Sequence, residues 1–278
     1  MIDSVFEVQD KIYIYFDGYG KVEENYVYVS YIDKKTMTYH VEKIEENSNS
    51  LFSPCHYINS YCREYFSHNN QIYCQTMKFN NSNRVCGMNG NYHLLYAQYI
   101  LYTEKNKKME KILEVDALSD CTLFNISNDN QYAFVISTYS AEDFLKCYGR
   151  ITIFDFITYR EIDRFNIEHL PLYRPIVYFF HWNHEEYIIF QANPYRCTFD
   201  NEKWHTYIYS IKEKKVIHED KKVFSLDYIP ERKLLLIQTK YRKIKTIFYE
   251  IDEEKVDIQL IIDNLLSTKF LGMKVNKD

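Results

Sequence analysis

The sequence predicts an all-β fold made of five similar four-stranded units. A hairpin signal, two apolar and aromatic runs around a short polar turn, recurs along the chain. The second runs contain Ile12, Ile72, Tyr132, Tyr187 and Leu234, at intervals of 60, 60, 55 and 47 residues. Self-similarity at this spacing is typical of an array of like structural units. Composition agrees, because 28 Tyr and 18 Phe in 278 residues favour pleated, half-buried strands.

A second hairpin follows each of these hairpins and turns at charged or polar residues. Residues 26–32 turn at 33–35 into 38–41, and residues 150–156 turn near Thr158 into 161–165. Apolar and polar residues alternate in these runs with a period of two, as strands require. Each unit therefore consists of four consecutive strands, called a to d here. A four-stranded antiparallel meander repeated in this way is the blade of a β-propeller.

We therefore expect a single domain over residues 1–278, a five-bladed β-propeller of four-stranded antiparallel blades. The blades are expected at residues 3–45, 57–116, 121–167, 174–219 and 222–262. Asn- and Ser-rich insertions at 46–64 and 76–92 enlarge the second blade, and residues 263–278 form a C-terminal helix or a closing strand. An irregular propeller of six or seven blades and a large β-sandwich are the alternatives.

The third blade carries a more specific resemblance. Ser127-Asn128-Asp129-Asn130 stands at its a–b turn, and Ile153-Phe154-Asp155 ends its strand c. These residues resemble the Ser-Pro-Asp-Gly turn and the aspartate-bearing strand c of the WD40-like group of β-propellers. The resemblance covers the architecture, since the Gly-His and Trp-Asp dipeptides of WD40 repeats are absent.

Charge and targeting signals narrow the class of protein. A net charge of −5 argues against a general nucleic-acid-binding protein. Residues 1–6 lack the features of a signal peptide, and no apolar run approaches the roughly 18 residues of a membrane span. Without an export signal, the seven Cys predict reduced thiols. We therefore expect a cytoplasmic protein with no membrane contact, and the sequence leaves its oligomeric state open.

Tyr and Arg recur in the b–c and d–a loops, which form the rim that propellers offer to their ligands. Both residue types dominate binding hot spots, because each combines a large contact area with directional hydrogen bonding. The predicted partner-binding residues are Tyr19, Tyr139, Tyr173, Arg174, Tyr195, Arg196, Tyr241 and Arg242. A chain with 28 Tyr also produces such pairs by chance, and Tyr159-Arg160 in a c–d turn is one of them.

Two groups of residues contain metal-ligating side chains. The first comprises Cys55, His56, Cys62, His68, Cys74, Cys86 and His93. Its Cys residues are 7, 12 and 12 positions apart, so it lacks the close pairs of a structural zinc site. The second is the stretch 181–186, His-Trp-Asn-His-Glu-Glu, in which a four-residue turn need not bring the side chains together and Trp182 is expected to cover a blade edge. We therefore expect no metal and no other cofactor.

Carboxylates at channel-side strand ends are the main enzymatic option. Five-bladed propellers include glycoside hydrolases, which need two or three carboxylates at matched distances. The candidates are Asp3, Asp116, Asp120 and Asp227, and none repeats at a fixed blade position. No phosphate loop, nucleophile elbow or dinucleotide fingerprint occurs.

The sequence therefore favours a non-catalytic scaffold that binds a protein partner through its Tyr- and Arg-rich rim. A role in host–phage or toxin–antitoxin conflict would suit such a scaffold. The alternative is a binder of small ligands or glycans, or a hydrolase, that uses the channel carboxylates.

Overall fold

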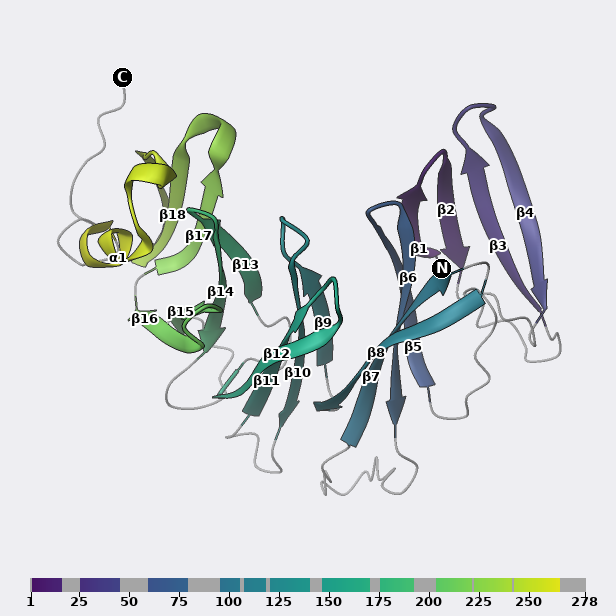
Figure 1. Ribbon diagram of the computed structural model, residues 1–278, viewed down its shortest axis with the longest axis horizontal. Coiled ribbons are helices and arrows are strands. Elements are labelled where there is room, and N and C mark those ends of the chain that lie inside the picture. Colours follow the sequence, from purple (N-terminus) through teal and green to yellow (C-terminus); the bar gives the residue numbers. More distant parts are fainter. Residues whose placement is uncertain are drawn as a thin grey trace. The chain divides into compact units, whose positions relative to one another are not determined.

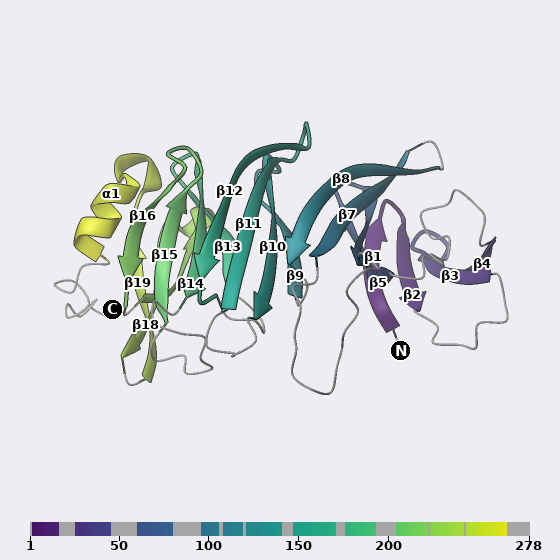
Figure 2. The ribbon, with the colours of Figure 1, turned by 90° about the horizontal axis from the view of Figure 1, so that it is seen from below.

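The computed structural model describes eleven segments of the chain, and the statements below concern these segments. They are residues 2–16, 26–45, 60–79, 96–105, 108–118, 121–140, 147–170, 176–192, 204–221, 223–241 and 243–265. Most of them are β-strands, arranged in five antiparallel sheets (Figures 1 and 2). The chain divides into two compact units, the first containing strands β1–β8 and the second everything from β9 onward. No helix in these segments is long and apolar enough to cross a bilayer.

The first unit contains two four-stranded sheets whose strands follow one another in sequence order. Sheet A is formed by β1 (Ile2–Val8), β2 (Lys11–Phe16), β3 (Tyr26–Asp33) and β4 (Thr38–Glu45). Sheet B is formed by β5 (Ser60–His68), β6 (Gln71–Phe79), β7 (Tyr96–Lys105) and β8 (Lys108–Leu118). The first strands of the two sheets, β1 and β5, lie side by side. Their shared core contains Phe6, Val29, Tyr65, Ile72 and Cys74.

The second unit contains three sheets. Sheet C is formed by β9 (Cys121–Ile126), β10 (Tyr132–Ser140), β11 (Cys147–Asp155) and β12 (Arg160–Glu168). Sheet D is formed by β13 (Val177–Trp182), β14 (Glu185–Ala192), β15 (His205–Ser210) and β16 (Lys215–Asp220). Sheet E is formed by β17 (Val223–Ile229), β18 (Leu234–Tyr241) and β19 (Lys243–Glu250).

The sheets of the second unit stack face to face around their first strands. β13 contacts both β9 and β17. One apolar cluster, which includes Phe134, Ile151 and Ile188, joins sheets C and D, and a second, which includes Ile189 and Leu235, joins sheets D and E. Consecutive meander sheets stacked on their first strands are the arrangement of propeller blades. The predicted all-β fold of five blade-like sheets is therefore confirmed, and the five second runs of the sequence pattern are β2, β6, β10, β14 and β18.

The last blade differs from its prediction. The fifth blade, expected at residues 222–262, was predicted to have four strands, but sheet E has three strands within the described segments. The chain instead forms the short helices η4 (Glu253–Lys255), α1 (Ile258–Leu260) and η5 (Ile261–Leu265). Ile258, Ile261 and Ile262 recur at helical spacing and pack into the cluster of sheets D and E. The Asp257 side chain accepts a hydrogen bond from the Leu260 amide at 2.7 Å, which caps the first turn.

The second blade also differs in its boundaries. Residues 60–64 and 76–79, expected in insertions, belong to β5 and β6.

The aspartates singled out by the resemblance stabilise turns. Asp129 Oδ1 accepts hydrogen bonds from the Ser127 hydroxyl at 2.6 Å and from the Gln131 amide at 2.9 Å. Asp155 ends β11 and accepts from the amides of Ile157 and Thr158 at 2.9 and 2.7 Å. In sheet A, Asp33 ends β3 and accepts in the same way from the amides of Lys35 and Thr36, at 2.9 and 3.0 Å. The same turn chemistry therefore recurs in both units.

The turn between β3 and β4 contains a residue in a left-handed conformation. Met37 has a φ of 55°, and it is 77% exposed. Because a Cβ makes this region unfavourable, Met37→Gly is expected to raise the free energy of unfolding by about 1 kcal/mol in urea denaturation. Lys35→Gly, in the same turn at a negative φ, is the control and should lower it. A loss of stability in Met37→Gly would contradict the turn assignment.

Candidate functional site

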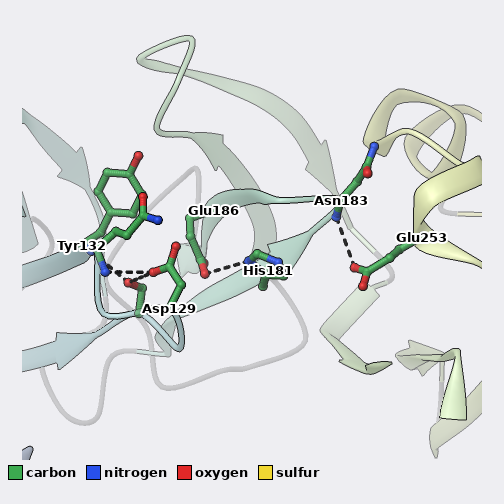
Figure 3. A network of polar contacts seen from close by, with 8 residues as sticks. Asp129, Tyr132, His181, Asn183, Glu186 and Glu253 are labelled. Carbon is green, nitrogen blue, oxygen red and sulfur yellow. Dashed lines mark hydrogen bonds and ion pairs between the residues drawn. The ribbon is translucent and has the colours of Figure 1, made fainter. Parts of the chain in front are cut away.

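A buried carboxylate lies where β14 begins (Figure 3). The side chain of Glu186 is 1% exposed, and its Oε1 lies 3.0 Å from Nδ1 of His181, its register partner on β13. Its other oxygen, Oε2, has no hydrogen-bond partner within the described structure. Burial raises the pKa of the Glu186 carboxyl, the contact with His181 acts in the opposite direction, and the charge of Asp129 raises the pKa further. Glu186 is therefore a carboxyl group for which the ionised form is unfavourable.

The polar contacts around the β13–β14 turn involve residues from three parts of the second unit. Asp129 lies on the turn that follows β9 and is drawn next to Glu186 in Figure 3. On the other side, the amide of Asn183 donates to Oε2 of Glu253 at 3.2 Å. Polar contacts thus connect the a–b turn of sheet D with the residues that follow sheet E. We call residues Asp129, His181, Asn183, Glu186 and Glu253 the turn network.

The turn that carries this network is shorter than expected. Asn183 and His184 both have positive φ, 47° and 61°, so they form a two-residue hairpin turn and not a four-residue one. This register places His181 opposite Glu186, whereas His184 is exposed. The sequence singled out these residues only as metal-ligand types, although the spacing of a two-residue hairpin would have predicted the pair.

The sequence suggested that Trp182 covers a blade edge, but this prediction is wrong. Trp182 is fully buried, and its Nε1 donates to the Val256 carbonyl at 2.7 Å. Its ring meets the ring of Tyr228 edge-on at 4.8 Å. Trp182 therefore links sheet D to sheet E and to the helical segment.

A second histidine–carboxylate pair lies at the opposite end of sheet D. Nδ1 of His205, at the start of β15, is within hydrogen-bonding distance of Glu219 Oε1. The Tyr207 hydroxyl donates to the same oxygen at 3.4 Å. A carboxylate beside Nδ1 orients the imidazole ring of His205.

The two groups of metal-ligand types do not form a metal site in the described part of the chain. No three His, Cys, Asp or Glu side chains converge there. Cys74 is buried in the core of the first unit. The side chains of Cys55, His56, Cys62, Cys86 and His93 lie outside the described residues.

The candidate catalytic carboxylates are exposed where they are described. Asp116 lies on β8, and Asp227 on β17 accepts a hydrogen bond from the Tyr228 amide at 2.9 Å. The side chains of Asp3 and Asp120 lie outside the described residues. Asp227 is thus a solvated strand residue with a local backbone contact.

The predicted partner-binding residues stand at the ends of described strands or in the segments that precede or follow them in the sequence. Tyr19, Tyr173, Arg174, Tyr195, Arg196 and Arg242 lie outside the described residues, as do the side chains of Tyr139 on β10 and Tyr241 on β18. The structure therefore does not bring these side chains together or separate them.

The strand directions nevertheless define one edge of the second unit. Tyr178 contacts Leu226 at 3.1 Å and Trp182 contacts Tyr228, so β13 and β17 run in the same direction. The proximity of Asp129, after β9, to Glu186, after β13, gives β9 and β13 the same direction. The b strands β10, β14 and β18 therefore end at a common edge, at residues 140, 192 and 241. We call it the b–c edge, and the turn network lies at the opposite edge.

Glu186→Gln is expected to raise the free energy of unfolding at pH 8 by about 1 kcal/mol, because it removes a buried charge with an unpartnered oxygen. The folded-state pKa is raised, so the carboxyl contributes stability below its unfolded pKa and loses it as pH rises through the folded value. The gain should therefore vanish at about pH 4, close to the ordinary pKa of Glu. Urea denaturation at both pH values measures it.

The neighbouring carboxyl provides a control of opposite sign. Contact with Lys212 lowers the pKa of Glu185, so its contribution is present above its unfolded pKa and is lost as pH falls. Glu185→Gln should therefore lower stability slightly at pH 8. If the free energy of unfolding of both variants changed with pH in the same way, the raised pKa of Glu186 would be contradicted.

Comparisons with known proteins do not assign the chain to a family. No family model matches the chain, and no curated protein matches it. Among solved structures, it is similar to the acylaminoacyl peptidase of Pyrococcus horikoshii, with 11% identity and a TM-score of 0.47, over 90% of this chain and 38% of the peptidase. It is also similar to the β-propeller domain of the Trilobed protease from Pyrococcus furiosus, with 11% identity and a TM-score of 0.48, over 90% of this chain and 68% of that one.

A glycosidase also matches the chain, with a lower TM-score. A xylan β-1,4-xylosidase of Bacillus halodurans matches with 8% identity and a TM-score of 0.37, over 85% of this chain and 48% of that one. All three TM-scores are below 0.5, so the fold assignment rests on the sheets themselves. Their strand order and stacking define the chain as a propeller-like all-β protein.

Proposed function

We propose that the protein is a non-catalytic scaffold that binds a protein partner through Tyr and Arg residues at the b–c edge of its second unit. Tyr and Arg provide large contact areas and directional hydrogen bonds, and loops presented by a rigid sheet scaffold are common binding elements. The partner is expected to offer carboxylates to the Arg side chains.

One observation carries the proposal. β10, β14 and β18 end at a common edge, and every predicted residue except Tyr19, which belongs to the first unit, stands at or next to one of the strand ends there. Tyr195 and Arg196 follow β14, Tyr241 and Arg242 stand at the end of β18, and Tyr173 and Arg174 precede β13. Residues far apart in sequence thus belong to neighbouring connections of one stacked unit.

The test is affinity capture from native lysate followed by mass spectrometry. A variant with Arg174, Arg196 and Arg242 changed to Glu should lose the captured partner while it keeps its circular dichroism spectrum. The matched control changes Arg160, Lys215 and Arg232 to Glu, three exposed cations near the opposite edge, and should retain the partner.

Undiminished capture by a folded b–c edge variant would contradict the proposal. Turnover of a glycan by the purified protein, lost on replacement of channel carboxylates, would favour the hydrolase alternative.

A further inference from the structure

The outer strand of sheet A is unusually exposed. Every side chain described on β4, from Thr38 to Lys43, is exposed, including Tyr39 at 60% and Val41 at 54%. The corresponding outer strands β8, β12 and β16 each contain buried or half-buried side chains. The outer strand of a sheet is, in general, a template for pairing with another strand.

The two faces of β4 have different side chains. One face carries Thr38, His40 and Glu42, and His40 stacks on Tyr31 of β3 with 4.9 Å between ring centroids. Tyr31 packs in turn on Tyr13 of β2, at 5.6 Å. The other face carries Tyr39, Val41 and Lys43. Any strand that pairs with β4 must therefore complement both faces. One offers His40 and Glu42, and the other offers Tyr39, Val41 and Lys43.

A second copy of β4 meets both requirements. Symmetric antiparallel pairing along the outer side of β4 needs a two-fold axis perpendicular to the sheet, and opposed residues must share a face. The axis therefore passes midway between one residue of β4 and the same residue of the second copy. An axis at Glu42 or Lys43 would set like charges opposite each other, which is unfavourable. An axis at Val41 sets Val41 against Val41, His40 against Glu42 and Tyr39 against Lys43.

We infer that the protein forms a two-fold symmetric dimer in which β4 pairs with β4 of a second copy, centred on Val41. The pairing joins two copies of sheet A into one continuous sheet. It gives two His40–Glu42 contacts on one face and two Tyr39–Lys43 contacts, of cation–π type, on the other. This inference does not depend on the proposed b–c edge, which belongs to the other unit.

The expected association is weak. A single pair of short strands buries far less area than the roughly 1,200–2,000 Å² of a stable interface. The dimer should therefore form in the micromolar range and dissociate on dilution. Sedimentation velocity over low to high micromolar concentrations measures this equilibrium, and hydrogen exchange adds a second readout, since amides on the outer side of β4 should be protected only in the dimer.

Val41→Lys tests the centre of the interface, because it sets two cations directly opposite each other. It should weaken the dimer at least about tenfold without affecting the fold, since Val41 is exposed. Val216→Lys is the control, because Val216 is 45% exposed on the outer strand β16 and should leave the dimer unchanged. Glu42→Lys should also weaken the dimer, and adding His40→Glu should restore it by exchanging the two sides of the contact.

Three results would overturn the inference. They are a monomer at every concentration, a dimer that Val41→Lys leaves unchanged, and a charge exchange that fails to restore association.

Discussion

Trp182→Ala is expected to lower the free energy of unfolding by about 3–5 kcal/mol. Trp182 is fully buried and contacts sheet D, sheet E and the helical segment after β19. Alanine would leave a cavity among three elements and would remove the hydrogen bond to the Val256 carbonyl. Urea denaturation followed by circular dichroism measures the loss, because the substitution removes one of the two Trp fluorophores.

Trp182→Phe separates packing from hydrogen bonding. It retains an aromatic ring against Tyr228 but has no donor for Val256, so it should cost less than alanine. Equal stability of the alanine variant and the unmodified protein would mean that Trp182 does not link sheets D and E.

Gly149→Ala is expected to cost about 1–3 kcal/mol, because β11 and the residues after β12 are in close contact there. A Cβ at position 149 would lie 2.2 Å from Cδ2 and 2.9 Å from Cβ of Leu170. Leu170 is fully buried in the cluster of sheets C and D, so it has little room to move. Thermal and urea denaturation of the purified variant measure the effect.

A double-mutant cycle identifies the contact. Leu170→Ala alone should lower stability by about 2–5 kcal/mol through a cavity. Gly149→Ala in the Leu170→Ala background should cost clearly less than in the unmodified protein, because the clashing atoms are gone. Additive losses would show that Leu170 is not the cause of the Gly149 requirement.

Strand identity was predictable because it depends on local pattern. The five recurring runs around Ile12, Ile72, Tyr132, Tyr187 and Leu234 are all strands, since alternating apolar residues need one buried face. The segment after β19 was mispredicted because Val256, Ile258 and Leu260 also fit an alternating pattern. Only the cluster around Trp182 favours the helical arrangement, in which Ile261 and Ile262 are buried together.

Local sequence pattern also predicted the turn network only in part. His181 and Glu186 were visible in the sequence, but their pairing depends on a two-residue turn whose residues both adopt positive φ. The raised pKa of Glu186 depends further on burial between sheets and on Asp129, 57 positions earlier in the chain. The burial of Glu186 and its proximity to Asp129 have no local signature.

By itself, the sequence predicted five sheets of consecutive antiparallel strands and the a–b turn at Asp129, because hairpins form between neighbours along the chain. It mispredicted the fourth strand of the fifth sheet. Tertiary structure decided which side chains are buried between sheets, that Trp182 is a core residue and that β4 is exposed. It also decided that the ends of β10, β14 and β18 share one edge. These properties depend on how separate sheets stack, and stacking is determined by contacts between residues that are distant in sequence.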